Sequence, residues 1–543
     1  MPGTHHNECD SSALLARSSR EKHGDGVLSV DHALELAGGW STFQWRLLCC
    51  LGGCMGFASA HMLCPIFLIP RMMEYWQLSA GESSMQASVF FAGYCVGVIL
   101  WAGISDRCGR RPATVYAFAV GNVSGIASFF APTYALFVLF RFACGVGVAG
   151  AKNGCFLLAT EFAPPAARAR VGALISYLWL CGLLYLVASA WLLQHLPWRW
   201  LVLSYLPALP VQFILLSLLP ESPRFLLVAS EPDKARQVIL NVFKANGRVP
   251  PSPLVLQTAG RKAASSSGAG GSSFSSGSTF GELWRRNVWA KTVTVGTCQG
   301  VCTMVFYAIT FDPRTNAAAG SLYLGALLGA LVELPAYMLL VPMTNRLGRR
   351  LAYSIFFVMS AASLFALHLS LASQTSAVGE DVREDGAGGG EQAGHTDHFH
   401  VMHTQGHVTG GTVATSAPSA NWLAVACALS GRFASVAATN VAYIVAAEAY
   451  PTSCRNSAVG WGTGCGRIGA MAAPAIMLSL PSPLIVFTLL CLGCAALVWR
   501  LPETAGAALA DVAGGTAPGA ADGRMSDDDA DGRADRDSQS DRE

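Results

Sequence analysis

The chain contains 543 residues, of which 52% are hydrophobic and only 13% are charged, and its formal net charge is +2. Soluble domains carry about 25% charged residues, so this composition argues against a soluble protein. The small net charge gives no reason to expect a nucleic-acid partner.

Twelve apolar stretches follow one another along the chain, and each has the roughly 20 residues that a helix needs to cross a bilayer. Backbone groups in hydrocarbon must be hydrogen-bonded internally, so we expect these stretches to be helices. The predicted spans are residues 46–68, 85–104, 113–131, 134–158, 171–193, 199–219, 288–310, 320–342, 351–372, 421–446, 457–480 and 482–500. The sequence therefore predicts an all-α, multi-pass membrane protein.

The spans form two groups of six, flanked and joined by polar segments. Lysines and arginines gather in the connections of one side, which is the cytoplasmic side by the positive-inside rule, and both termini lie there too. The predicted units are a cytoplasmic N-terminal tail (1–45), an N-terminal six-helix bundle (46–219), a cytoplasmic amphipathic helix with a Gly/Ser linker (220–287), a C-terminal six-helix bundle (288–500) with a disordered outer insertion (373–420), and an acidic, disordered cytoplasmic tail (501–543).

Sequence patterns of common enzyme sites do not occur in the chain. It has no GxxxxGK[ST] loop, no HExxH pair and no convincing nucleophile elbow. We therefore expect a protein that is not an enzyme and that needs no cofactor. The run "HTDHFHVMHTQGH" in the outer insertion could bind zinc or copper, but a polar, disordered loop explains it as well, and we expect no metal site.

Three motifs occur twice, at matching places in the two groups of spans. "GISDRCGRRP" after the second span returns as "MTNRLGRRLA" after the eighth, and "EFAPPAARARVGALISY" after the fourth returns as "EAYPTSCRNSAVGWGTG" after the tenth. "LPESPRF" after the sixth span returns as "LPETAG" after the twelfth. These pairs predict two homologous halves, an architecture in which transporters bind substrate near the midplane between the halves.

The motifs resemble those of the major facilitator superfamily. Within it, "LVELPAYMLL", "NRLGRR" and "AEAYPTSCRNSAVGWGTGCGRIGAMAAP" resemble the organic cation/anion/carnitine transporters and the related synaptic-vesicle transporter-like proteins. The resemblance covers residues from about 40 to 505 and implies two pseudo-symmetric six-helix bundles. The chain differs from this pattern in the short connection at 69–84, in His61 where vesicle-type relatives carry a carboxylate in span one, and in Asn345 where the first turn has Asp106.

The charged turns have a topological explanation and a conformational one. Their arginines would hold the loops in the cytoplasm, but Asp106 does not contribute to that orientation. The resemblance implies an intracellular clasp between helices that holds the cytoplasmic side shut. The matching residues are Asp106, Arg110, Arg111, Glu161 and Arg168 in the first half, and Arg349, Arg350, Glu448 and Arg455 in the second.

Ionisable residues inside spans are costly, so they normally face a cavity or a partner. Glu333, Arg432 and Arg467 fall near the predicted midplane, while Arg141 and Lys152 lie above and below the centre of span four. Glu333 and Arg432 could form a structural ion pair, which would leave Arg467 without a carboxylate in its half. The resemblance implies that an arginine at this place in span eleven accompanies anionic or carnitine-like substrates. The predicted substrate-binding residues are Arg467, Glu333, Arg432, His61, Tyr337, Tyr443, Trp179 and Tyr307.

These observations favour a secondary transporter of small organic ions, in particular organic anions or carboxylate-bearing zwitterions, that works by alternating access. Its expected partners are the substrate and the lipid bilayer, and we expect a monomer in the plasma membrane rather than in a vesicle. One alternative is a sugar or neutral-solute porter, although "TVGTCQGVCTMVFYA" lacks the paired glutamines usual in such porters. Another is a vesicle or sensor protein that binds without transporting.

Overall fold

The structure is a computed structural model that describes residues 27–206, 209–257, 281, 283–286, 288–386, 421–450 and 454–504. Several predicted segments lie outside the described residues. They are the N-terminal tail up to residue 26, residues 258–280 of the linker, residues 387–420 with the His-rich run, and the acidic tail from residue 505.

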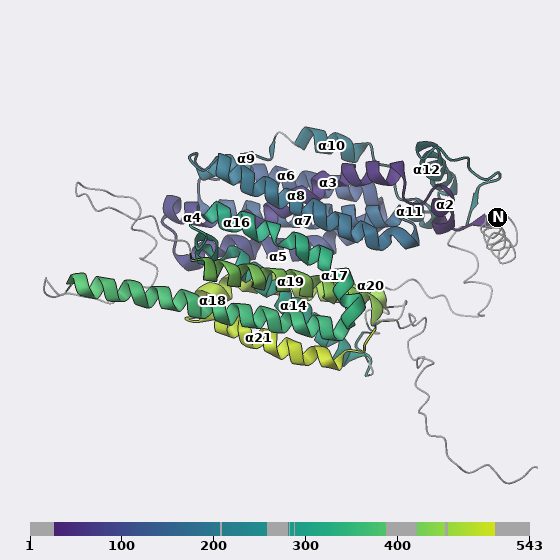
Figure 1. Cartoon of the computed structure of the whole chain (residues 1–543). Helices are drawn as coiled ribbons and strands as arrows, with labels where there is room; N and C mark the ends of the chain where they lie inside the picture. Colours follow the sequence, from purple (N-terminus) through teal and green to yellow (C-terminus); the bar gives the residue numbers. More distant parts are fainter. Residues whose placement is uncertain are drawn as a thin grey trace, which may run out of the picture.

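The helices of the N-terminal half occupy the first six predicted positions and lie together in Figure 1, coloured purple to blue. They are α3 (Thr42–Leu63), α4 (Pro65–Trp76), α5 (Ala80–Cys108), α6 (Arg110–Ala127), α7 (Tyr134–Glu161), α8 (Arg168–Leu192), α9 (Trp198–Leu203) and α10 (Leu209–Ser217). The sixth predicted span, 199–219, is therefore represented by the two shorter helices α9 and α10.

The C-terminal half lies beside the first half in Figure 1, coloured teal to yellow. Its helices are α14 (Trp289–Phe311), α15 (Pro313–Ala317), α16 (Leu322–Leu331), α17 (Glu333–Leu347), α18 (Arg349–Gly386), α19 (Trp422–Glu448), α20 (Arg455–Ser479) and α21 (Pro483–Leu497). Helix α18 continues past the predicted span end at 372, so the first part of the segment predicted to be a disordered insertion is helical.

Within the described residues, ten helices are long and apolar enough to cross a membrane. Of the two remaining predicted positions, one holds α9 and α10, and the other holds the glycine-rich helix α20. Every predicted span therefore coincides with helix, and the prediction of an all-α membrane protein is confirmed.

Prolines divide two of the spans into pairs of helices. Helix α3 ends at Leu63 and α4 begins at Pro65, which has no N–H to continue the ladder of hydrogen bonds. Likewise α16 ends at Leu331 and α17 begins at Glu333, because Pro335 cannot donate to the Leu331 carbonyl. This break places the Glu333 carboxylate at a helix N-terminus, where the helix dipole favours a negative charge.

The two halves touch along helices from both. Helix α5 packs against α20, and the Ser88 hydroxyl donates a hydrogen bond of 2.9 Å to the Met471 carbonyl. A second contact joins α4 to α16. The Arg71 guanidinium donates to the Tyr323 hydroxyl at 2.9 Å, and the Phe67 ring stacks on the Tyr323 ring. These contacts between the halves are packing and hydrogen bonds, and neither of the two hydrogen bonds is made to an acidic group.

A small layer of further elements covers one end of the N-terminal half. Helix α12 (Pro232–Ala245) is the predicted amphipathic helix, and its buried side chains are Ala235, Ile239, Val242 and Phe243. The short helices α2 (Val30–Leu36) and α11 (Pro223–Val228) pack beside it, and strand β1 (Val27–Leu28) pairs in parallel with β2 (Val255–Leu256). The segment before the first span is therefore attached to the segment that follows the sixth.

Both GRR turns depend on a glycine and on a carboxylate from another segment. Gly109 has φ 105° and ψ 161°, and Gly348 has φ 81° and ψ 166°, a region that only glycine occupies freely. The Glu221 carboxylate accepts hydrogen bonds from the Arg110 and Arg111 backbone N–H groups at 2.9 and 3.2 Å. The Glu503 carboxylate accepts the equivalent bonds from Arg349 and Arg350 at 2.8 and 3.1 Å. The repeated "LPES" and "LPET" thus cap the helices that follow the turns.

We expect Gly109→Ala to lower the melting temperature of the full chain in detergent by several degrees. The new Cβ would lie 2.4 Å from a Glu221 carboxylate oxygen, and the backbone conformation is strained for alanine by about 1–3 kcal/mol. Gly103→Ala, on the helix α5 that leads into the turn, is the control, because its Cβ would meet no atom within 4 Å. Equal melting temperatures for the two variants would contradict this account of the turn.

Candidate functional site

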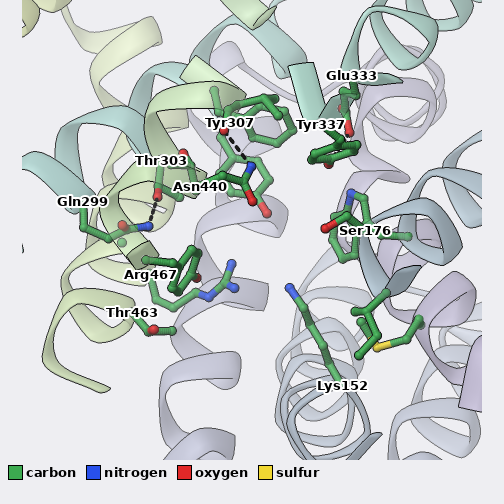
Figure 2. A pocket seen from close by; sticks show the side chains of 18 residues that line it. Lys152, Ser176, Gln299, Thr303, Tyr307, Glu333, Tyr337, Asn440, Thr463 and Arg467 are labelled. Carbon is green, nitrogen blue, oxygen red and sulfur yellow. Dashed lines mark hydrogen bonds between the residues drawn. The ribbon is translucent and has the colours of Figure 1, made fainter. Parts of the chain in front are cut away.

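A cavity lies between the two halves, about 170 Å³ in volume and partly open to solvent. Helices α3, α7 and α8 line it from the N-terminal half, and α14, α17, α19 and α20 from the C-terminal half (Figure 2). Its lining residues are Met55, Lys152, Ile175, Ser176, Trp179, Gln299, Thr303, Phe306, Tyr307, Glu333, Tyr337, Val436, Thr439, Asn440, Tyr443, Thr463, Gly466 and Arg467. Six of the eight residues predicted to bind substrate are among them.

Arg467 extends from α20 into this cavity and is 8% exposed. Its guanidinium carbon lies 4.5 Å from the centre of the Tyr94 ring, which stabilises the positive charge through the face of the ring. Within the described part of the chain, no carboxylate lies within ion-pair distance of Arg467, and its Nε has no hydrogen-bond partner. A permanent charge is therefore held in the cavity with donors left to bind a ligand.

Close packing of α20 against α14 positions Arg467. A Cβ added at Gly469 would lie 2.2 Å from the Gly300 carbonyl oxygen, so only glycine permits the observed approach of the two backbones. Gly466, next to the arginine, leaves room for the side chains of Gln299 and Thr303 on α14. The glycines of the eleventh span, α20, thus permit its close packing against α14.

Lys152 reaches the same cavity from α7 in the other half. Its amino nitrogen lies 4.4 Å from the centre of the Trp179 ring, and the residues that the structure describes offer it no carboxylate within ion-pair distance. Figure 2 shows the Lys152 amino group and the Arg467 guanidinium directed toward a common space from opposite sides. The sequence marked Lys152 as a charge within a span but assigned it no role in binding.

Glu333 and Arg432 form a buried ion pair. The carboxylate accepts a hydrogen bond of 2.8 Å from the Arg432 guanidinium and one of 3.1 Å from the Tyr337 hydroxyl. Both charged side chains are almost fully buried, at 1% and 3% exposed, so each satisfies the other in a region that water scarcely reaches. Arg432 does not line the cavity and lies against the Phe306 ring instead. Of the two, only Glu333 borders the space where a substrate would sit.

His61, which we expected in the substrate site, does not line this cavity. Its ring is 3% exposed and lies inside the N-terminal half, 4.4 Å from the Phe57 ring and 4.8 Å from the Tyr205 ring between their centroids. The Arg141 guanidinium donates to the His61 backbone carbonyl at 2.6 Å and approaches the ring Nδ1 at 3.3 Å. The histidine therefore serves to accommodate a buried arginine on α7, away from the cavity.

Several uncharged polar residues border the cavity without having been predicted. Gln299 and Thr303 lie on one face of α14, and the Gln299 amide approaches the Thr303 hydroxyl at 3.5 Å. The others are Ser176, Thr439, Asn440 and Thr463. These last four each donate a hydrogen bond to a backbone carbonyl one turn earlier in their own helix. They stand among apolar and small residues, and nothing local in the sequence indicates that they border a cavity. Together they can orient a ligand that the charged groups attract.

The charged turns form two equivalent clusters, one in each half. In the second half, Arg349 binds both oxygens of Glu448, at 3.1 and 3.2 Å, and also contacts Asn345 at 3.1 Å. In the first half, Arg110 contacts Asp106 at 2.9 Å and Glu161 at 3.6 Å. Each cluster joins three helices of the same half. The described residues therefore show ties within the halves, where we expected a clasp that shuts the cytoplasmic side.

The membership of the predicted clasp also needs correction. Arg168 pairs with Asp31 of α2 at 2.7 Å, and Arg224 contacts the same carboxylate. Arg111 and Arg350 donate to the backbone carbonyls of Ser217 and Trp499. The side chain of Arg455 lies outside the described residues. Glu221 and Glu503, which sequence reasoning had noted only as parts of repeated motifs, are the carboxylates that bind the turns themselves.

The family model described as "Sugar (and other) transporter" matches residues 47–381. The chain belongs to this family. With its two groups of helices, the chain is therefore a multi-pass membrane transporter of the major facilitator superfamily. The fold predicted from the repeated motifs is confirmed.

The chain is similar to two groups of transporters and transporter-like proteins. Solute carrier family 22 member 3 of Rattus norvegicus is 26% identical over 442 residues, which cover 77% of this chain and 66% of that protein. The organic cation transporter protein of Drosophila melanogaster is 26% identical over 441 residues, or 79% of this chain and 71% of its own length. The synaptic vesicle 2-related protein of Xenopus laevis is 32% identical over 233 residues, 42% of this chain and 41% of that one. The resemblance stated from the motifs is thereby confirmed.

Among solved structures, the xylose transporter XylE from E. coli in a partially occluded inward-open conformation matches with a TM-score of 0.60. It is 16% identical, and the match covers 86% of this chain and all of that one. At this identity the match describes the fold.

The geometry of the turns predicts unequal roles for their carboxylates. Glu448→Gln should slow transport at least several-fold and lower the melting temperature, because it removes one partner of a bidentate pair that is only 16% and 25% exposed. Loss of one member of a buried pair costs roughly 3–5 kcal/mol, and less where water reaches it. The control is Asp106→Asn, which removes a charge whose side chain is 73% exposed and should have little effect. A larger defect in Asp106→Asn than in Glu448→Gln, measured on equal amounts of reconstituted protein, would contradict this order.

Proposed function

We propose that the chain transports small organic anions, or zwitterions that carry a carboxylate, across a membrane by alternating access between its two halves. The observation that carries the proposal is the Arg467 guanidinium, which projects into the cavity between the halves without a carboxylate partner among the described residues. A guanidinium stays charged at any physiological pH and presents a fork of donors that matches a carboxylate. A substrate carboxylate supplies the missing counter-charge.

The rest of the cavity supports an organic ligand. Trp179, Tyr307, Tyr337 and Tyr443 contribute aromatic surface, and Gln299 and Asn440 contribute amide groups. Sites for small molecules are mostly apolar with a few placed polar groups, which is the mixture seen here. Because Glu333 is neutralised by Arg432, it does not offer a free negative charge for a cation.

A sugar or another neutral solute is the second candidate. The family description includes sugar transporters, and the amides and hydroxyls of Gln299, Thr303 and Asn440 are groups that also bind sugar hydroxyls. A neutral ligand would leave the charge of Arg467 uncompensated, which is why we favour the anion. A protein that binds the same ligand without moving it is the third candidate, and reconstituted protein that shows binding but no flux would identify it.

Location and assembly follow from the resemblance to organic ion transporters. We infer that the chain acts as a monomer in the plasma membrane with both termini in the cytoplasm. The relative named for synaptic vesicles keeps an intracellular membrane as the alternative. Fluorescent tagging of the full chain, with surface biotinylation, distinguishes the two membranes.

Arg467→Ala should weaken carboxylate binding by roughly 10-fold to 150-fold. It removes a charge-assisted hydrogen bond worth about 1.5–3 kcal/mol. Arg467→Lys should restore only part of the affinity, because the charge returns without the fork. The measurement is the initial rate of uptake against concentration for a panel of carboxylates in liposomes that contain the full chain.

The control for this series is Arg107→Ala, which removes an arginine from an exposed position in the first charged turn. It should leave carboxylate affinity within about twofold of the unmodified chain. The assignment of Arg467 to the substrate fails if Arg467→Ala binds carboxylates with unchanged affinity.

A further inference from the structure

Lys152 is the second basic residue in the cavity that lacks a carboxylate partner among the described residues. It lies on α7 of the N-terminal half, while Arg467 lies on α20 of the C-terminal half. Its amino group rests on the Trp179 ring, and a cation–π contact stabilises an ammonium group without neutralising it. The ammonium group therefore keeps hydrogen-bond donors free toward the cavity.

The charges that border the cavity do not balance. Its ionisable lining residues other than tyrosines are Lys152, Arg467 and Glu333. Glu333 is already paired at 2.8 Å with Arg432, which lies behind the lining, so this pair contributes no net charge. The guanidinium of Arg467 and the amine of Lys152 remain, and in a medium of low dielectric constant the charged guanidinium opposes protonation of the amine. A ligand with two negative charges favours the protonated amine and neutralises both groups, whereas a monoanion compensates only one of them.

The α7 backbone on both sides of Lys152 packs closely against its neighbours. A Cβ added at Gly150 would lie 2.4 Å from the Trp101 ring, and one added at Gly154 would lie 2.1 Å from the Thr114 hydroxyl, so α7 packs closely against α5 and α6 on both sides of the lysine. The charge is thus fixed to the N-terminal half, as Arg467 is fixed to α14 and the C-terminal half. A ligand with one anionic group at each end contacts one cation from each half.

We propose that Lys152 is a second anion-binding residue and that the preferred substrates are small organic dianions, with one acidic group at Arg467 and the other at Lys152. This inference rests on the proposed function, since it extends the anion site of Arg467 across the cavity. It adds a substrate class and a specificity-determining residue from the opposite half.

The test compares acids that differ only in the number of carboxylates. Uptake by the full chain in liposomes is measured for succinate against butyrate, glutarate against pentanoate, and adipate against hexanoate. The unmodified chain should take up the best diacid with a KM at least 10-fold below that of the monoacid of equal length. Lys152→Met should raise the diacid KM about 10-fold to 150-fold and change the monoacid KM by less than about threefold. Lys152→Arg should keep most of the preference.

Two further variants control the result. Lys244→Met makes the same chemical change at an exposed position on α12 and should leave both KM values unchanged. Lys152→Gln, which keeps hydrogen-bonding capacity, replaces Lys152→Met if the latter does not fold, as judged by thermal unfolding of the purified chain. The diacid preference of the unmodified chain tests the proposal without any variant.

The outcomes separate this inference from the proposed function. Uptake of monoacids and diacids with equal KM, or equal loss of both in Lys152→Met, overturns the dianion proposal and leaves anion transport standing. A chain that takes up no carboxylate of either kind overturns both. A diacid preference that disappears in Lys152→Met and survives in Lys152→Arg supports the inference.

Discussion

A guanidinium cannot give up its charge, so Arg467 needs compensation at a position that is almost fully buried between two helical bundles. The Tyr94 ring supplies part of it, and glycines at 466 and 469 let α20 lie close enough to α14 to hold the side chain in the cavity. The other buried arginines of the spans have partners inside the protein: Arg432 has the Glu333 carboxylate, and Arg141 has the backbone and ring of His61. Arg467 is the buried arginine that faces the space between the halves.

The remainder of the structure keeps each half rigid so that this space can change shape. The turns after the second and eighth spans are built alike, with an arginine side chain, a glycine of positive φ, and a carboxylate from the end of the half. These ties lie within the halves, and the contacts between halves that we describe are packing and hydrogen bonds to uncharged acceptors, such as Arg71 to Tyr323. Movement of one half against the other then breaks few charged contacts, which suits two conformers separated by a few kcal/mol.

The sequence predicted what depends on local pattern. Span positions follow from apolar length, and the GRR turns from repeated motifs, so both matched the structure closely. The Glu333–Arg432 pair was foreseen as an alternative because two opposite charges lay at similar depth. The sequence did not predict which face of each helix borders the cavity, because that depends on how the helix is rotated about its own axis. His61 was expected to face the cavity, Lys152 was given no role in binding, and Gln299 and Asn440 were not singled out. Glu221 and Glu503 stood in visible repeats, but their contact with backbone N–H groups spans more than 100 residues.

The central claim is that the cavity selects for negative charge. The most direct measurement is the uptake of matched pairs of solutes by the purified full chain in liposomes, such as a benzoate against a benzylammonium and a hexanoate against a hexylammonium, with glucose as the neutral comparison. The account predicts saturable uptake of the carboxylates, inhibited by other carboxylates, and little uptake of the ammonium ions or the sugar. Saturable uptake of the ammonium ions alone, or of the sugar alone, would contradict it.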